Sequence, residues 1–209
     1  MLFDLDGTLT DPYPGISAGI VHVCRMLGRP EPNVDVLRSM IGPPFQETFT
    51  EVLGIAHDQV DDAIGVYRSV YETGGLYDAS VYDGISASLA CLHNDGHVLA
   101  LATSKPTESA TRVLQYFGLD RWFAFIGGAA RDGTRHHKAD VIGHVLESVA
   151  TKRNGQRVVM VGDRRYDIEG ARAHGLSAVG VSWGYADPGE LVDAGAERIV
   201  HHPSELIDL

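Results

Sequence analysis

Apolar residues recur three and four positions apart through residues 13–79, the spacing that places side chains on one face of an α-helix. Shorter helices are predicted over residues 34–41 and 45–53, separated by breaks rich in glycine and proline. Because no convincing strand pattern interrupts them, the region is predicted to be all-helical, with roughly four helices. The two longest apolar sets are Ile16, Ile20, Val23 and Leu27, and then Val60, Ile64, Tyr67 and Tyr71.

From residue 85 onward, helical and β-rich segments alternate along the chain. Such alternation predicts a parallel, doubly wound α/β sheet with helices packed on it. Strands are predicted over residues 1–3, 97–103, 123–127, 157–162, 178–182 and 198–200. Among the helices between them, one is predicted to bury Ala110, Val113, Leu114 and Phe117, and another Val141, Ile142, Val145, Leu146 and Val149.

The helical region is inserted between the first and second predicted strands. The chain is therefore predicted to have a core domain of residues 1–12 and 80–209 and a cap domain of residues 13–79 over the strand ends. The first strand begins at Met1 with almost no lead-in, so either it is very short or upstream residues are missing.

The composition is that of an ordinary globular protein, with 44% hydrophobic and 22% charged residues among 209. A formal net charge of −11 disfavours a nucleic-acid polymer or a membrane surface as main partner, but it permits a small anionic substrate held by local cations. Without a membrane-length apolar run or a leader-like N-terminus, a cytoplasmic location is expected. Cys24 and Cys91 are expected to be reduced packing residues. Nothing in the pattern specifies an oligomeric state.

Two acids lie where the first predicted strand ends. Asp4 follows the strand directly, Asp6 comes two residues later, and Gly7 then allows the chain to turn. Ligands of an open parallel sheet bind outside the carboxyl ends of its strands, and a carboxylate placed there can act as a nucleophile. The simpler alternative is an acidic turn after a strand, which this short motif alone does not exclude.

Hydroxyl and cationic side chains occur at two further strand and helix ends. Thr103 and Ser104 precede a predicted helix, where hydroxyls and free backbone N–H groups can bind an anion, although an ordinary capping turn explains them equally well. Lys138 precedes another helix, where its charge opposes the helix dipole by about 0.3–1 kcal/mol if exposed. A bound phosphate or a carboxylate cluster would compensate, whereas the alternative is a solvated basic loop.

The last candidate acids are Asp163 and Asp167, at the end of the strand predicted over residues 157–162. This strand is predicted to lie beside the first one, which would bring Asp163 close to Asp4. At about 4 Å and an effective dielectric constant near 20, the two charges would repel each other by about 4 kcal/mol. A divalent cation would remove that conflict, and oxygen-only ligands with room for water suit Mg²⁺.

Together these elements resemble the haloacid dehalogenase-like hydrolase superfamily over nearly the whole chain. Its four motifs are matched by Asp4-Leu5-Asp6-Gly7-Thr8, by Thr103 or Ser104, by Lys138, and by Gly162-Asp163 with Asp167. The helical insertion is similar to the first type of cap in that family. Further details resemble its phosphoglycolate phosphatase-like branch, especially the bacterial 5'-nucleotidase-like group: Ile41-Gly42-Pro43-Pro44, Thr103-Ser104-Lys105-Pro106 and Gly162-Asp163-Arg164.

The resemblance implies a Mg²⁺-dependent phosphatase that acts on a small phosphorylated metabolite. Asp4 would attack the phosphorus and become an aspartyl phosphate, while Asp6 would protonate the leaving alcohol and later deprotonate the attacking water. Mg²⁺ would be held by Asp4, Asp163 and the backbone carbonyl of Asp6, with Asp167 assisting through a water molecule.

The family's phosphate site would consist of Ser104 or Thr103 together with Lys138, which would neutralise the phosphoryl oxygens. The cap would close over the site and exclude bulk water. Substrate specificity is expected in the cap, around residues 43–47, and at Asp11 and Tyr13 where the chain enters it. None of these residues identifies the substrate.

Several alternatives stay open or are disfavoured. Asp6 argues against a dehalogenase, since a halide leaving group needs no proton. A phosphomutase of the same fold remains possible, and so does a non-catalytic phosphate-binding or regulatory protein, although the intact set of acids argues against the latter. The adjacent histidines at residues 136–137 and 201–202 are a weak candidate for a metal site, because neighbouring imidazoles rarely point at one ion.

Overall fold

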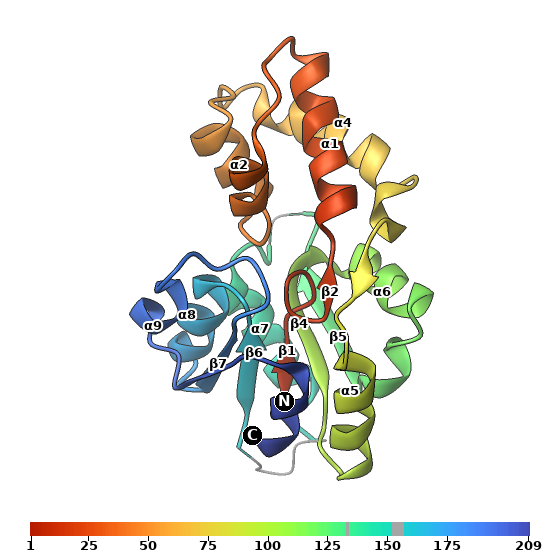
Figure 1. The fold of residues 1–209 in the computed structure, drawn as a ribbon, viewed down its shortest axis with the longest axis vertical. Coiled ribbons are helices and arrows are strands. Elements are labelled where there is room, and N and C mark those ends of the chain that lie inside the picture. The colour runs from red at the N-terminus through yellow and green to blue at the C-terminus, as the bar shows by residue number, and fades with distance from the viewer. Residues whose placement is uncertain (133, 152–156) are drawn as a thin grey trace. The chain divides into compact units, whose positions relative to one another are not determined.

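The computed structural model describes residues 1–132, 134–151 and 157–209. The chain divides into two compact units, and each is described by itself (Figure 1). Met1–Asp11 and Val81–Leu209 form the core unit, and Pro12–Ser80 form the helical unit. Two short strands, β2 (Thr10–Asp11) and β3 (Ser80–Val81), pair with each other where the chain passes between the units.

A six-stranded parallel sheet organises the core unit, in the order β5-β4-β1-β6-β7-β8. The predicted doubly wound α/β fold is confirmed, and β1 pairs with β6 as expected; on its other side β1 pairs with β4. The strands are β1 (Leu2–Phe3), β4 (Ala100–Pro106), β5 (Phe125–Ala129), β6 (Val159–Gly162), β7 (Ser177–Val181) and β8 (Arg198–Val200).

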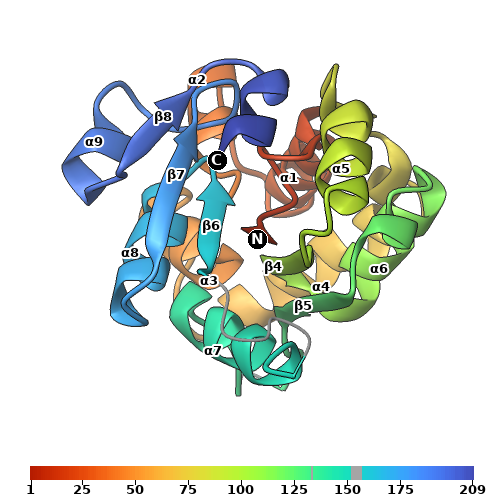
Figure 2. The same cartoon turned by 90° about the horizontal axis from the view of Figure 1, so that it is seen from below.

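Helices cover both faces of this sheet. Figure 2 shows α7 and α8 on one side and α5 and α6 on the other. Between the sheet and α7 and α8 lies an apolar core that includes Leu2, Val145, Met160 and Ile168, all nearly inaccessible to solvent. The helical elements are α5 (Ile85–Asn94), α6 (Thr107–Tyr116), α7 (Lys138–Ser148), α8 (Arg165–Ala173) and α9 (Glu190–Ala194), with 3₁₀ turns at Asp120–Trp122 and Pro203–Asp208.

The helical unit follows the predicted pattern closely. Its second apolar set is buried along one face of α4, and Tyr67 packs against Gly19 of α1 so closely that a Cβ there would lie 2.6 Å from the Tyr67 ring. A small residue on α1 therefore sets the approach of the two helices. The elements are α1 (Tyr13–Met26), α2 (Val34–Ser39), α3 (Phe45–Glu47), a π-helical turn (Thr48–Val52), α4 (Val60–Tyr71) and a 3₁₀ turn (Gly75–Tyr77).

The predicted boundaries of two strands were wrong at both ends by two to three residues. The strand expected over residues 97–103 is β4, Ala100–Pro106, because the His97 N–H still bonds to Leu92 O in the turn that ends α5. The strand expected over residues 123–127 is β5, Phe125–Ala129, because the Phe123 N–H closes the preceding 3₁₀ turn.

Two apolar residues at helix ends differ from the expected burial. Leu27, expected on the buried face of α1, follows the last turn of that helix and is 43% exposed. Phe117 follows α6 in the same way and is only half-buried. Within the described part of the chain, no helix has both the length and the apolar character needed to cross a membrane.

Candidate active site

The candidate site lies at the topological switch point of the sheet, where the order in which successive strands are added reverses. From β1 the chain continues to β4 and β5 on one side, whereas β6, β7 and β8 follow one another on the other side. Asp4 immediately follows β1, and Asp163 immediately follows β6, the neighbouring strand. Because ligands of doubly wound sheets bind at such a switch point, these two carboxylates occupy the position expected for a reaction centre.

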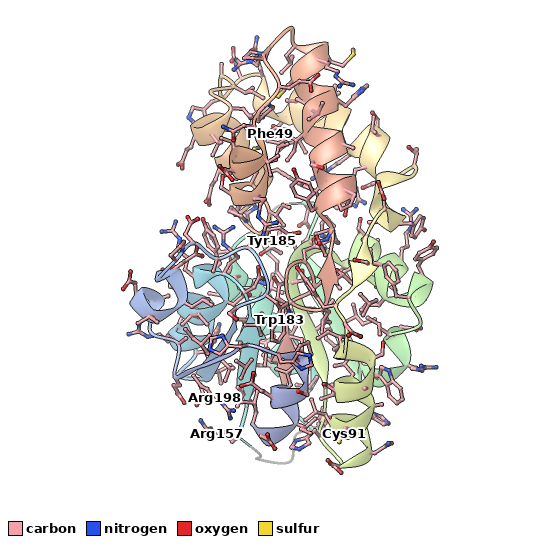
Figure 3. All side chains as sticks on the ribbon, in the orientation of Figure 1. Phe49, Cys91, Arg157, Trp183, Tyr185 and Arg198 are labelled. Atoms are coloured by element: carbon pink, nitrogen blue, oxygen red, sulfur yellow. The ribbon has the colours of Figure 1, made fainter. Side chains whose placement is uncertain are left out.

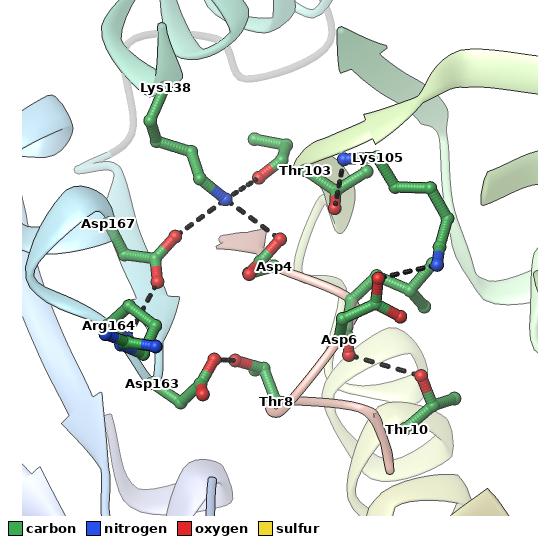
Figure 4. Close-up of polar contacts among 12 residues, drawn as sticks. Asp4, Asp6, Thr8, Thr10, Thr103, Lys105, Lys138, Asp163, Arg164 and Asp167 are labelled. Atoms are coloured by element: carbon green, nitrogen blue, oxygen red, sulfur yellow. Dashed lines mark hydrogen bonds and ion pairs between the residues drawn. The ribbon is translucent and has the colours of Figure 1, made fainter. Parts of the chain in front are cut away.

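Three acids form a tight cluster at this position, which we call the acid triad: Asp4, Asp163 and Asp167 (Figure 4). One carboxylate oxygen from each lies within 4.8 Å of the others. All three residues are buried, with at most 4% of their surface exposed. The structure therefore brings the first and fourth motifs together, as the sequence predicted. The Asp6 carboxylate is not part of the triad.

Lys138 neutralises part of the triad. Its ammonium lies 2.8 Å from Asp4 Oδ1 and 2.7 Å from Asp167 Oδ1, and it donates a 3.1 Å hydrogen bond to Ala102 O. Burial alone would lower the pKa of Lys138, but the charges of Asp167 and Asp4 outweigh it and raise that pKa. Lys138 is the first residue of α7, where its positive charge opposes the helix dipole, and the two carboxylates compensate for that charge. Because Lys138 is only 7% exposed, the alternative of a solvated basic loop is wrong.

Asp163 is held by groups from two loops. Its carboxylate accepts a 3.1 Å hydrogen bond from Thr8 Oγ1 and a 2.9 Å bond from the Tyr185 N–H. Burial, followed by repulsion from Asp167 and Asp4, raises the pKa of Asp163 well above its usual value. Burial likewise raises the pKa of Asp167 to about 6, although Lys138 opposes the shift. The triad is thus an electrostatically costly arrangement without a further cation.

Asp6 has a separate counterion. Lys105 Nζ lies 2.6 Å from Asp6 Oδ2, and the two side chains are only 5% and 13% exposed, respectively. Burial raises the pKa of Asp6, although Lys105 works against the shift. Asp6 Oδ1 is also buried, and among the described residues it has no hydrogen-bond partner.

The two predicted phosphate-binding hydroxyls lie within β4, whereas the sequence placed Thr103 at the end of the strand and Ser104 after it. Thr103 is 1% exposed, and its Oγ1 accepts a 3.2 Å hydrogen bond from the Lys105 N–H, whereas Ser104 is half-buried. The pairing of β4 with β5 shifts register between Thr103 and Pro106. The expectation that the strand ends at Thr103 was therefore wrong, because a β-bulge continues it to Pro106.

The sequence did not identify the segment after β7, which forms part of the site. Trp183 Nε1 donates a 3.1 Å hydrogen bond to Thr8 O, and Tyr185 donates its N–H to Asp163 and its hydroxyl to Asp11. Trp183 and Tyr185 lie at the carboxyl end of the sheet, and Arg157 lies at the opposite end (Figure 3). Gly184, two residues after the strand predicted over residues 178–182, was the signal that could have pointed to this loop.

Glycines make room for the triad. A Cβ built on Gly7 would lie 2.1 Å from Asp163 Oδ2, and one on Gly184 would lie 2.4 Å from the same atom. A Cβ on Gly162 would lie 2.1 Å from Asp167 Cγ. The backbone therefore approaches the acids more closely than any other residue type would permit.

The residues present fit a divalent cation. If all are ionised, the three buried carboxylates of the triad and the partly exposed carboxylate of Asp6 face two buried ammonium groups, which leaves two negative charges uncompensated. The donors of the triad are oxygens only, the ligands that hard cations such as Mg²⁺ prefer. No histidine belongs to a metal-type cluster among the described residues, so the paired-histidine alternative gains no support. Both cysteines are free.

Comparison with known proteins supports the family that the sequence motifs resemble. A model of the haloacid dehalogenase-like hydrolase family matches residues 1–181. The crystal structure of a predicted phosphatase from Clostridium acetobutylicum superimposes with a TM-score of 0.93 at 36% identity, covering 99% of this chain and 95% of that one.

Two curated relatives align over the whole chain. The 5'-nucleotidase of Pseudomonas aeruginosa is 37% identical, and 92% of its length is covered. The tyrosine-protein kinase PtkA of Mycobacterium tuberculosis is 39% identical, and 70% of its length is covered. The chain belongs to the haloacid dehalogenase-like hydrolase family. It is an enzyme of the phosphoric monoester hydrolase class.

Proposed function

We propose that the protein is a Mg²⁺-dependent phosphatase of small phosphorylated metabolites that works through an aspartyl phosphate on Asp4. The observation that carries the proposal is the cluster of Asp4, Asp163 and Asp167 at the switch point of the sheet, with Lys138 paired to Asp4 and Asp167. Asp6, two residues after Asp4, supplies a second carboxyl group with its own buried counterion.

Asp4 and Asp6 have different roles in the reaction: Asp4 is the nucleophile, and Asp6 is the general acid and base. An oxygen of Asp4 attacks the phosphorus, the bond between phosphorus and the ester oxygen breaks, and the leaving oxygen takes a proton from Asp6. Asp6 then removes a proton from a water molecule, whose oxygen attacks the aspartyl phosphate and releases inorganic phosphate. Asp6 thereby returns to its protonated form, and Asp4 is regenerated.

The other residues bind and orient the phosphoryl group. Lys138 and the hydroxyl of Thr103 or Ser104 neutralise its non-bridging oxygens, so catalysis depends mainly on position and charge. Mg²⁺ would be held by Asp4, Asp163 and the backbone carbonyl of Asp6, with Asp167 assisting through a water molecule. When bound, the ion offsets the repulsion among the acids and part of the phosphoryl charge.

The helical insertion is proposed to select the substrate. In this proposal residues 13–79 act as the cap, and residues 43–47 with Asp11 and Tyr13 determine the specificity for the alcohol part of the ester. The motif resemblance and the 37% identity to a 5'-nucleotidase favour a nucleoside monophosphate, with phosphoglycolate as the other candidate. Turnover of a panel of such esters with Mg²⁺ decides between them.

The nucleophile is tested with Asp4→Asn. This variant is expected to lose turnover of every ester, since an amide cannot form the aspartyl phosphate, while its circular dichroism and unfolding midpoint stay close to those of the wild type. Asp193→Asn, an exposed acid in α9, is the matched control and should keep full activity. Substantial turnover by Asp4→Asn would refute Asp4 as the nucleophile.

A second candidate comes from the relative that is named a tyrosine-protein kinase. The same aspartyl phosphate could pass its phosphoryl group to a tyrosine hydroxyl instead of water. Incubation with γ-labelled ATP separates the two functions. Label on a tyrosine peptide would favour the kinase, and release of inorganic phosphate from small esters alone would favour the phosphatase.

A further inference from the structure

Lys105 is a buried cation to which the proposed chemistry gives no role. The residue is 8% exposed, and its ammonium lies 2.6 Å from Asp6 Oδ2 (Figure 4). A buried ion pair is weak evidence for stability, because desolvation of both groups offsets much of their attraction. The position of Lys105 beside the proposed acid therefore calls for a functional explanation.

The backbone directs Lys105 into the site. Thr103 pairs with Gly128 and Pro106 pairs with Ala129, so Ser104 and Lys105 are two extra residues on β4. Such bulges re-aim side chains next to active sites. The Lys105 N–H is fixed by a 3.2 Å hydrogen bond to Thr103 Oγ1.

The neighbouring strand accommodates this bulge. A Cβ on Gly128 would lie 2.4 Å from Lys105 O and 2.8 Å from the Thr107 nitrogen, so β5 needs a glycine opposite the bulge. The lysine is thus held at both its backbone and its ammonium group.

The two oxygens of Asp6 have different environments. Oδ2 faces an ammonium, which has only protons to donate, so this oxygen accepts from Lys105. Oδ1 is buried and has no hydrogen-bond partner among the described residues. Only Oδ1 is left to exchange a proton with the ester oxygen or with water.

We propose that Lys105 is a positioning residue that binds Asp6 Oδ2 and so directs Asp6 Oδ1 at the reacting oxygen. The inference rests on the proposed function, since it assumes that Asp6 protonates the leaving group. A well-placed proton donor contributes a rate factor of about 100 to 10,000. The contribution matters for an alkyl ester, whose alkoxide leaves poorly, and little for 4-nitrophenyl phosphate, whose phenolate leaves without a proton.

The test compares kcat/KM for those two kinds of ester in Lys105→Met, Lys105→Arg and Asp6→Asn. The alkyl ester is whichever of 2-phosphoglycolate and uridine 5'-monophosphate the wild type hydrolyses better. In Lys105→Met, kcat/KM should fall about 100-fold for the alkyl ester and by less than about 10-fold for the aryl ester. Lys105→Arg should recover part of the alkyl activity.

A double variant separates positioning from a merely structural effect. If Lys105 acts through Asp6, adding Lys105→Met to Asp6→Asn should cause little further loss, because the two residues work as one unit. Arg157→Met is the control: it removes an exposed cation paired with Glu197 and should leave both activities unchanged. Equal losses for the two esters, or additive losses in the double variant, would overturn the proposal.

Failure of the proposed function is a distinguishable result. A wild type that hydrolyses neither ester would refute the phosphatase, and crystal structures of the wild type and Lys105→Met would then decide the positioning claim. The Asp6 side chain should occupy one rotamer in the wild type and another, or several, in Lys105→Met. An unchanged Asp6 rotamer would overturn the inference.

Discussion

Close packing at single glycines sets the geometry of the acid triad. Gly184 does not have a positive φ, so its backbone conformation would permit a larger residue. The obstacle is steric, because a Cβ would lie 2.4 Å from Asp163 Oδ2 and 2.5 Å from Gly7 O. Both neighbours are constrained, since one is a buried acid with two hydrogen bonds and the other is backbone. The position of Asp163 therefore depends on a residue in another loop.

Gly184→Ala is expected to displace Asp163. Overpacking of this kind costs about 1–3 kcal/mol of unfolding free energy, measured by urea titration, and should also weaken Mg²⁺ binding in calorimetry. Gly65→Ala in α4 is the matched control: a Cβ there meets nothing within 4 Å. It should be neutral or stabilise the protein by up to about 1 kcal/mol. Equal stability and metal affinity for the two variants would contradict this account.

At the scale of elements, Glu190 joins the start of α9 to the start of α8. Its carboxylate accepts hydrogen bonds from Arg164 Nε at 2.9 Å, the Arg165 N–H at 2.8 Å and the Asp187 N–H at 3.0 Å. Burial alone would raise the pKa of Glu190, but the N–H donors of Arg165, Arg164 and Asp187 outweigh it and lower that pKa. The ionised carboxylate thus stabilises the loop that carries Asp163.

Glu190→Gln is expected to lower the unfolding free energy by about 1–3 kcal/mol at pH 7, since an amide accepts fewer and weaker hydrogen bonds. Because the folded pKa is depressed, the stabilisation is present above the unfolded value of 4.5 and is lost as the pH falls through the folded pKa. The difference between the two proteins should therefore shrink below pH 4.5 in urea titrations. Glu147→Gln, an exposed acid in α7, is the control. A difference that persists at low pH would argue against an ionised Glu190.

Charge balance is a property of the whole molecule, because the acids follow β1 and β6 or lie in α8, whereas their counterions Lys105 and Lys138 lie in β4 and α7. With all four acids ionised, two negative charges are uncompensated, and this makes the metal-free protein less stable than its packing allows. A cation that binds only the folded state stabilises it by mass action, by about 2.7 kcal/mol at a hundred times its dissociation constant.

Mg²⁺ should accordingly raise the unfolding midpoint of the wild type in calorimetric scans, and chelation should reverse the rise. Asp163→Asn should abolish this dependence. Without metal it should be at least as stable as the wild type, because it removes a buried charge that faces two others. Asp193→Asn should behave as the wild type. A variant at Asp163 that still responds to Mg²⁺ would show that the ion binds elsewhere.

Much of the fold followed from local pattern. The helix predicted around Val60 and Tyr67 was confirmed, and so were the order of strands and helices and the pairing of β1 with β6. Strand ends were less accurate, because they depend on turns such as the His97 N–H bond and on the bulge before Pro106. Neither feature has a reliable signature in a single sequence.

The sequence by itself determined which faces of the helices are buried and which acids follow strands, since both depend on residues close together in the chain. Only the tertiary structure decided which side chains meet. Thr8 reaches Asp163 across 155 residues, and Lys105 reaches Asp6 because β4 bulges beside β1. Such contacts arise from strand pairing and backbone geometry, which act between distant segments and leave no spacing that periodicity can detect.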